Sequence, residues 1–142
     1  MKILFYGTKN YDEQFFDKLL PEFPGIEIKF IEANIHEETA SLAKGYEAIC
    51  AFVNADLSTK VIEELHQQGV KLILMRCAGY NNVDLKTAQK YGIKVLRVPG
   101  YSPEAVAEHA MALALTANRH THKAYIKCRE NNFTLNGLMG AV

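Results

Sequence analysis

The residues best suited to bind a small anion lie in two short segments, Cys77-Ala78-Gly79 and Pro99-Gly100-Tyr101. Gly79 lets a ligand approach the main chain without a Cβ in the way. Two adjacent amides in such a turn can grip a carboxylate, and the Tyr101 hydroxyl can donate to the same anion. Residue types alone leave alternatives to anion binding open. The first segment could be a plain strand-to-helix turn, and Tyr101 could simply pack over the start of a helix.

Three other groupings suggest chemistry, and each has a simpler structural explanation. Arg76 precedes the first segment and could pair with a carboxylate bidentately, but a structural ion pair is the favoured use. Glu108 and His109 are consecutive in a helical pattern, so their side chains diverge by about 100°. We therefore favour a structural or interface role for both. His120 and His122 are two residues apart, which is a poor spacing for shared metal ligation.

Cysteine number and net charge limit the class of protein. Cys50, Cys77 and Cys128 are odd in number and lack metal-ligand spacing, so we expect reduced thiols in a cytoplasmic protein and no metal site. The 16 basic and 16 acidic residues balance, which argues against nucleic acid or an anionic membrane surface as a partner. No apolar run reaches the roughly 20 residues of a transmembrane helix.

Short apolar segments that end in turn residues predict five strands. They cover residues 2–6, 26–31, 48–53, 72–75 and 93–98. Helical patterns with their caps lie between the strands, at residues 12–20, 39–44, 58–69 and 84–92. This alternation indicates right-handed crossovers and an α/β fold with a doubly wound parallel sheet.

The second strand segment alternates charged and apolar residues, as a half-exposed edge strand does, whereas the first is a continuous apolar run after Lys2. This contrast favours the flavodoxin-like strand order 2-1-3-4-5. The continuous apolar run from Leu72 to Met75 predicts a strand buried on both faces. Ligands of such sheets bind outside the carboxyl ends of the strands. The two candidate anion-binding segments follow the fourth and fifth strands and should therefore be neighbours.

Two other flavodoxin-like classes are disfavoured. A phosphate-accepting receiver domain needs acidic residues after the first strand and an aspartate after the third, but those ends read Tyr6-Gly7-Thr8 and Phe52-Val53-Asn54. A flavin-binding flavodoxin needs a hydroxyl-rich phosphate loop after the first strand, and Gly7-Thr8-Lys9-Asn10 contains a single hydroxyl.

A long C-terminal helix is predicted after the sheet, over residues 102–132. Ser102-Pro103-Glu104 has a hydroxyl cap, proline at the first helical position and an acid in the first turn. Alanines on one face of this helix allow another element to approach closely. Asn131 and Asn132 are expected to end it, and the tail at residues 133–142 has no clear periodicity.

Two motifs resemble the NAD-dependent D-2-hydroxyacid dehydrogenases, and the bacterial D-lactate dehydrogenases most of all. The first motif is Arg76-Cys77-Ala78-Gly79-Tyr80-Asn81-Asn82-Val83-Asp84. The second runs from Val98-Pro99-Gly100-Tyr101-Ser102-Pro103 to Glu108-His109-Ala110. The resemblance extends over nearly the whole chain. It implies a two-domain enzyme that reduces pyruvate to D-lactate with NADH.

The resemblance implies roles for four residues. The main chain at Ala78 and Gly79 would hold the substrate carboxylate, Tyr101 would donate its hydroxyl to the same group, and Phe52 would line the pocket near the substrate's methyl group. It also implies a division of the chain, listed in order: a flavodoxin-like substrate domain at residues 1–101, an interdomain and dimerisation helix at 102–132, and a truncated linker toward a missing NAD-binding domain at 133–142.

The chain departs from this family in its extent. It has no Gly-x-Gly-x-x-Gly fingerprint, and the family's catalytic arginine, glutamate and histidine have no counterpart in it, so we expect no catalytic residue here. We expect an excised substrate domain that binds no NAD, binds a small 2-oxo or 2-hydroxy acid weakly, and is inactive alone. Its alanine-rich helix should fold back onto the sheet or form a homodimer through residues 103–130. The alternative is a stand-alone flavodoxin-like binding or dimerisation module without catalysis.

Overall fold

The computed structural model describes residues 1–141, and the chain divides into two compact units at Pro99 and Gly100. The first unit contains a single parallel sheet. Its strands are β1 (Lys2–Phe5), β2 (Glu27–Phe30), β3 (Ala48–Ala51), β4 (Leu72–Met75) and β5 (Lys94–Arg97). Its α-helices are α1 (Asn10–Leu19), α2 (Thr59–Gln67) and α3 (Leu85–Lys90), and two 3₁₀ turns are η1 (Leu20–Glu22) and η2 (Ala40–Ala43).

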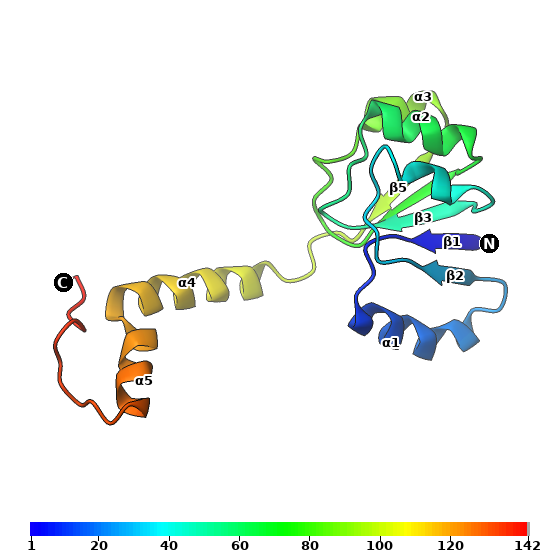
Figure 1. Cartoon of the computed structure of the whole chain (residues 1–142). Coiled ribbons are helices and arrows are strands. Elements are labelled where there is room, and N and C mark those ends of the chain that lie inside the picture. The colour runs from blue at the N-terminus through cyan, green and yellow to red at the C-terminus, as the bar shows by residue number, and fades with distance from the viewer. Residues whose placement is uncertain (142) are drawn as a thin grey trace. The chain divides into compact units, whose positions relative to one another are not determined.

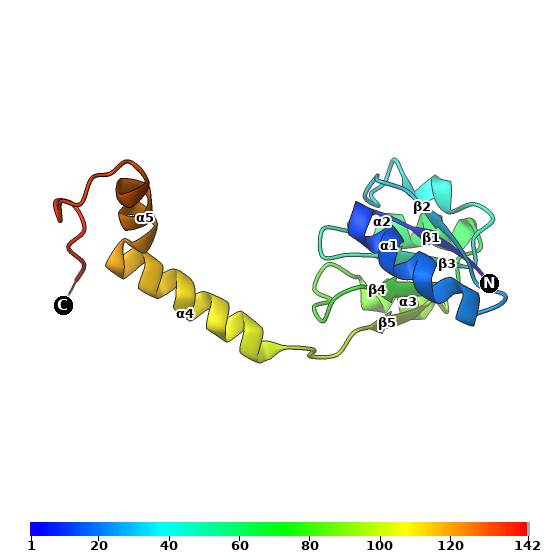
Figure 2. The same ribbon diagram turned by 90° about the horizontal axis from the view of Figure 1, so that it is seen from below.

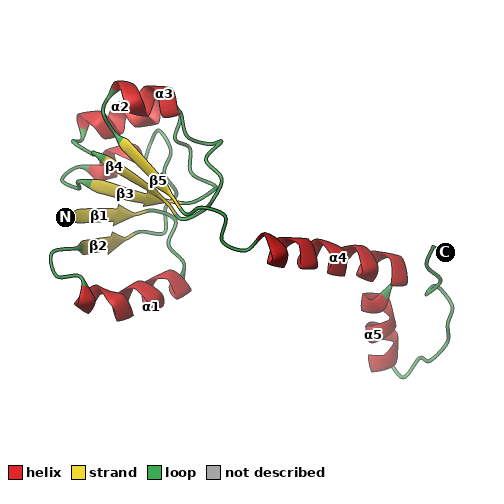
Figure 3. Cartoon of the chain, turned by 180° about the vertical axis from the view of Figure 1, so that it is seen from behind, coloured by secondary structure: helices red, strands yellow, loops and turns green. Residues whose placement is uncertain are grey.

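The strand order is β2-β1-β3-β4-β5 and every pair is parallel, which confirms the predicted flavodoxin-like sheet. Figures 1 and 3 show the helices of this unit on both faces of the sheet. As predicted, β2 is an edge strand in which exposed and half-buried residues alternate.

The larger core lies between the sheet and the helices α2 and α3. Val61, Ile62 and Leu65 of α2 are fully buried, as their helical spacing predicted. They pack with Ile49 and Ile73, which point to the same face from the centre of the sheet. Burial of each such side chain stabilises the fold by roughly 1.5–3 kcal/mol, so this face anchors the strands whose ends carry the candidate site.

The opposite face of the sheet is covered less completely. Helix α1 packs there through Phe16, whose ring contacts those of Phe5 and Phe30 with centroids 5.2 and 6.3 Å apart. Figure 2, seen from this side, shows α1 over one part of the sheet and β5 away from it. Leu72 and Leu74 of β4 are consequently only half-buried. The prediction that β4 is buried on both faces is therefore wrong.

The second unit consists of the helices α4 (Pro103–Arg119) and α5 (Thr121–Arg129) and a tail. The sequence predicts one helix here, but the chain breaks at His120, which takes the left-handed conformation with φ of 51°. The tail returns to the helices of this unit, because Lys127 Nζ donates to the Asn136 carbonyl and Ala141 N–H donates to Asn118 Oδ1. The last residue of the predicted 133–142 linker lies outside the described residues. None of the helices described is long and apolar enough to cross a membrane.

Candidate functional site

The candidate site is the turn that follows β4. Its far end is anchored by Asp84, the N-cap of α3, whose carboxylate accepts hydrogen bonds from Thr87 N–H at 3.1 Å and from Thr59 Oγ1 at 2.6 Å. These hydrogen bonds lower the pKa of Asp84 to about 2. The contact with Thr59, at the start of α2, ties two helices together below the turn. The turn is therefore held at its helical end by a carboxylate that is ionised at neutral pH.

Two successive main-chain amides in this turn have no protein acceptor. Among residues 1–141, neither Ala78 N–H nor Gly79 N–H donates a hydrogen bond. Ala78 is half-buried and Gly79 is exposed. A Cβ on Gly79 would meet nothing within 4 Å. An anion can therefore reach both donors from solvent, and main-chain amides of this kind hold carboxylates elsewhere.

Phe52, at the end of β3, is joined to the same turn. Asn82 Nδ2 donates to the carbonyls of Ala55 at 2.9 Å and of Phe52 at 3.4 Å, which links the loop after β3 to the turn after β4. The Arg76 guanidinium carbon lies 5.2 Å from the centroid of the Phe52 ring. The ring remains 43% exposed. Phe52 thus offers an accessible apolar surface just after the strand that neighbours β4.

Arg76 forms the structural ion pair that its position suggested. Its Nη1 lies 3.0 Å from Asp12 Oδ2, with side-chain exposures of 16% and 14%. Nη2 donates to the Tyr6 carbonyl at 3.0 Å, and the guanidinium stacks over Phe5 at 4.2 Å. These contacts engage both terminal nitrogens of Arg76, whereas its buried Nε has no hydrogen-bond partner among the described residues. Arg76 therefore serves as a structural support next to the turn.

Arg97, the last residue of β5, and Val98, which follows it, make two more contacts with the turn. Arg97 Nη1 donates to the Ala78 carbonyl at 3.0 Å, and Val98 N–H donates to the Cys77 carbonyl at 3.2 Å. The sequence reasoning missed Arg97. The signal was available, because Arg97 pairs with Met75 in the parallel register and so stands level with the start of the turn.

The two cysteines near the turn are reduced and poorly nucleophilic. Burial raises the pKa of Cys50 to about 12, although the nearby Arg76 opposes this change. Burial also raises the pKa of Cys77, whose Sγ donates to the Gly79 carbonyl at 3.2 Å. All three cysteines of the chain are free, as expected. No cluster of metal-ligating side chains occurs among residues 1–141.

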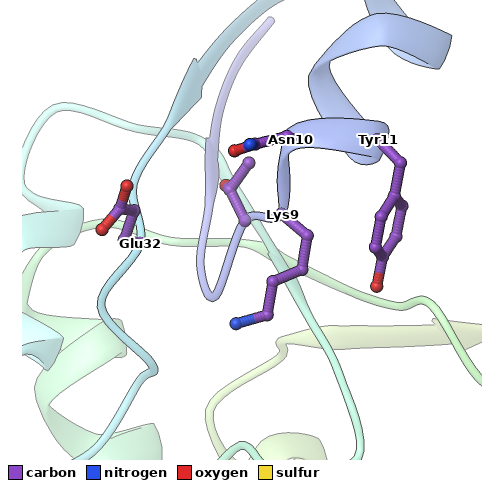
Figure 4. Close-up of a pocket in the computed structure, with 5 residues that line it drawn as sticks. Lys9, Asn10, Tyr11 and Glu32 are labelled. Carbon is purple, nitrogen blue, oxygen red and sulfur yellow. The ribbon is translucent and has the colours of Figure 1, made fainter.

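Apart from the turn after β4, an open hollow of about 500 Å³ lies at the start of α1. Figure 4 shows Lys9, Asn10 and Tyr11 on one side of it and Glu32 on the other. Three amides of this turn are already engaged, because Gly7 N–H donates to Ala33, Thr8 N–H to Ile31 and Lys9 N–H to Asp12. Glu32 stands on the other side of this hollow, where its negative charge would repel the phosphates of a dinucleotide.

Tyr101 belongs to the second unit, where its side chain is 73% exposed. Its predicted hydrogen bond to the anion at Ala78 and Gly79 stays a prediction. Glu108, His109 and His122 are exposed in the same unit, and His120 is half-buried at the helix break. None of the four has a hydrogen bond or ion pair to another side chain among the described residues.

Known proteins resemble this chain over nearly its whole length. Residues 3–135 match the family described as D-isomer specific 2-hydroxyacid dehydrogenase, catalytic domain. D-lactate dehydrogenase of Escherichia coli is 50% identical over 140 residues, which are 99% of this chain and 42% of that protein. Its apo structure superposes with a TM-score of 0.83 and covers 99% of this chain and 44% of that one.

Two further solved structures share the fold. The pyruvate reductase of Chlamydomonas reinhardtii is 42% identical with a TM-score of 0.85, and the match covers all of this chain and 42% of that one. D-lactate dehydrogenase from Lactobacillus jensenii, solved with NAD⁺, is 26% identical with a TM-score of 0.67 and coverage of 99% and 43%. The chain thus spans less than half the length of the relatives that it matches.

Proposed function

The chain belongs to the D-isomer specific 2-hydroxyacid dehydrogenase family, and from this premise we propose that it binds the carboxylate of a small 2-oxo acid at the turn after β4. The observation that carries the proposal is the pair of adjacent amides at Ala78 and Gly79, which donate to no acceptor within residues 1–141. Two charge-assisted hydrogen bonds from fixed amides suit a carboxylate better than a neutral group.

Phe52 and Tyr101 complete the proposed site. The exposed Phe52 ring belongs to the residue that follows β3, the strand next to β4 in the sheet. An apolar surface there favours a methyl group over a charged group next to the carbonyl carbon, so we propose pyruvate as the substrate. The Tyr101 hydroxyl is proposed as a third donor to the carboxylate. In the proposed site, the substrate's carboxylate contacts the amides and Tyr101, and its methyl group lies at the Phe52 ring.

The reaction proposed for the whole protein is reduction of pyruvate to D-lactate with NADH. A hydride must reach the substrate's carbonyl carbon, and an acid must protonate the new alkoxide. The L. jensenii relative was solved with NAD⁺. The sequence has no Gly-x-Gly-x-x-Gly fingerprint for a dinucleotide, so the contribution proposed for this chain is to hold and orient the 2-oxo acid. We propose that residues 1–101 are the substrate domain, 102–132 the interdomain segment and 133–142 a linker.

A homodimer through residues 103–130 is also proposed. Four large apolar side chains of α4 are more than half exposed: Val106 at 67%, Met111 at 61%, and Leu113 and Leu115 at 56% each. Exposed apolar surface on one helix favours association. Sedimentation velocity should show a dimer, and Met111→Glu should shift the chain to monomer. A monomer at all concentrations would contradict this part of the proposal.

The substrate proposal is tested by following main-chain amide shifts of the ¹⁵N-labelled chain during titration with pyruvate. We expect saturable shifts at Ala78 and Gly79 and smaller ones near Phe52. Methyl pyruvate, which lacks the negative charge, is the matched control and should shift neither amide. The absence of pyruvate-dependent shifts at the turn would favour the stand-alone module without a substrate site.

A further inference from the structure

Two consecutive carbonyls of the turn are held by the end of β5. The Cys77 carbonyl accepts from Val98 N–H at 3.2 Å, and the Ala78 carbonyl accepts from Arg97 Nη1 at 3.0 Å. The strand register places these donors beside the turn, because Arg97 pairs with Met75, the last residue of β4. The turn is therefore tied to its neighbouring strand by one main-chain bond and one side-chain bond.

These bonds also determine where the free amides point. A trans peptide is planar, so its C=O and N–H groups point in opposite directions. The structure has no cis peptide bond among its described residues. The bond from Val98 to Cys77 therefore orients Ala78 N–H, and the bond from Arg97 to Ala78 orients Gly79 N–H. Each amide faces away from the β5 group that holds its peptide.

The orientation of the peptide between Ala78 and Gly79 depends on the Arg97 side chain. The preceding peptide, between Cys77 and Ala78, is held by the main chain of Val98 instead. Gly79 is exposed, and glycine permits large rotations of the adjoining peptides at little steric cost. Within residues 1–141 the Ala78 carbonyl accepts from Arg97 alone, and Gly79 N–H donates to nothing. Without the guanidinium, this peptide has no hydrogen bond that distinguishes the anion-binding orientation from the flipped one.

Arg97 is itself held in place. Its guanidinium carbon lies 5.2 Å from the centroid of the Tyr80 ring, within the range of a cation–π contact. The planar guanidinium can stack on this ring and donate to a carbonyl at the same time. Arg97 thus contacts the turn twice, at Ala78 and at Tyr80, on both sides of Gly79.

We infer that Arg97 is a positioning residue, which orients the Gly79 amide through the Ala78 carbonyl and so prepares the turn to bind a carboxylate. This inference rests on the proposed carboxylate site. Arg97 acts through the turn and is not itself a ligand of the substrate. A cation near the site also attracts anions without orienting anything, so the test must separate orientation from charge.

The test uses Arg97→Met, which removes the donor and the charge but keeps a long apolar side chain. Lys94→Met is the matched control, since Lys94 is an exposed cation on the same strand that makes no side-chain hydrogen bond or ion pair among the described residues. Both variants and the unaltered chain are ¹⁵N-labelled. The first readout is the heteronuclear NOE of the Gly79 amide without ligand, and the second is the Kd for pyruvate.

We expect Arg97→Met to lower the Gly79 NOE and to weaken pyruvate binding about tenfold, the loss of roughly one net hydrogen bond. Lys94→Met should leave the Gly79 NOE unchanged and the Kd within about twofold, as weak screened charge effects do. An unchanged Gly79 NOE in Arg97→Met would overturn the inference. So would an equal loss of affinity in Lys94→Met, because charge alone would then explain it.

The two readouts separate this inference from the substrate proposal. If the unaltered chain shows no pyruvate shifts, the substrate proposal fails, and the ligand-free NOE of Gly79 still decides whether Arg97 orients the peptide. If Arg97→Met does not fold, Arg97→Gln replaces it, because glutamine is neutral and its side chain is too short to reach the Ala78 carbonyl. A Gly79 amide as rigid in Arg97→Gln as in the unaltered chain would likewise overturn the inference.

Discussion

Arg76 and Asp12, which are 64 positions apart in the chain, form an ion pair with 3.0 Å between Nη1 and Oδ2 directly below the candidate site. Arg76 is the residue before the turn, and Asp12 lies in the first turn of α1. Because Arg76 also donates to the Tyr6 carbonyl, one side chain connects the ends of β1 and β4 with the start of α1. The position of the turn relative to the sheet thus depends on this pair.

Asp12→Asn should destabilise the first unit by about 3 kcal/mol, because it leaves the largely buried Arg76 guanidinium without its counter-charge. Urea unfolding followed by circular dichroism measures the change. Glu37→Gln is the control, since Glu37 pairs with Lys60 at 3.2 Å on the exposed surface and should cost less than about 1 kcal/mol. Equal effects of the two substitutions would show that the Arg76 pair does not support the turn.

Acid should weaken the cap of α3. The pKa of Asp84 is lowered from 3.8 to about 2 by its hydrogen bonds with Thr59 and Thr87. A carboxyl group with a lowered pKa in the folded state stabilises the fold above its unfolded pKa, and this contribution is lost as pH falls through the folded value. The unaltered chain should therefore exceed Asp84→Asn in stability at pH 7, with the difference shrinking between about pH 4 and pH 2.

Urea midpoints at pH 7, 4, 3 and 2 give this comparison. Asp17→Asn is the control, because Asp17 is exposed on α1 and accepts no side-chain hydrogen bond among the described residues. A difference between the unaltered chain and Asp84→Asn that stays constant over this pH range would mean that the carboxylate is not what holds the cap.

The three thiols should react with iodoacetamide in the order Cys128, Cys77, Cys50. Cys128 is exposed, whereas burial raises the pKa of Cys77 and brings that of Cys50 to about 12, from an ordinary value of 9. This shift lowers the thiolate fraction of Cys50 about a thousandfold at neutral pH, and the thiolate is the reactive form. Peptide mass spectrometry after timed labelling measures the order. Cys50 labelled as fast as Cys128 would contradict the described core.

Tyr101→Phe should weaken pyruvate binding about fivefold, since it removes one proposed hydrogen bond to the carboxylate. Amide-shift titration of the chain measures the Kd. Tyr125→Phe is the control, because Tyr125 is a similarly exposed tyrosine of α5. The Kd of this variant for pyruvate should equal that of the unaltered chain. An unchanged Kd in Tyr101→Phe would remove Tyr101 from the proposed site and leave the turn as the only anion contact.

The isolated chain should not consume NADH in the presence of pyruvate. Its sequence has no Gly-x-Gly-x-x-Gly fingerprint for a dinucleotide, and hydride transfer requires the nicotinamide to be held against the substrate carbon. Absorbance at the NADH band measures turnover against a protein-free blank. Consumption that rises in proportion to the concentration of purified chain would contradict this expectation.

Local patterns predicted most of the sheet. Alternation in β2 identified an edge strand, and the apolar first strand identified a central one, which together led to the observed order. Asp84 was recognised as the start of α3 because an acidic N-cap is a local signal. The ion pair of Arg76 was also expected, although its partner was not, since Asp12 is distant in sequence.

Features that depend on more than local sequence were missed. A continuous apolar run predicted that β4 is buried on both faces, but Leu72 and Leu74 are half-buried because α1 covers only part of that face. The periodicity after Ser102 continues through His120, and nothing in that pattern marks the left-handed residue that separates α4 from α5. Arg97 was overlooked because its function depends on strand register and on which carbonyl its side chain reaches.

The most direct test of the account is a crystal structure of the chain soaked with oxamate, an amide analogue of pyruvate. We predict its carboxylate at about 2.7–3.2 Å from both Ala78 N and Gly79 N, the range of an N–H···O bond, with the Ala78 carbonyl still bonded to Arg97. A carboxylate bound away from these two amides, for example in the hollow lined by Lys9 and Tyr11, would contradict the central claim.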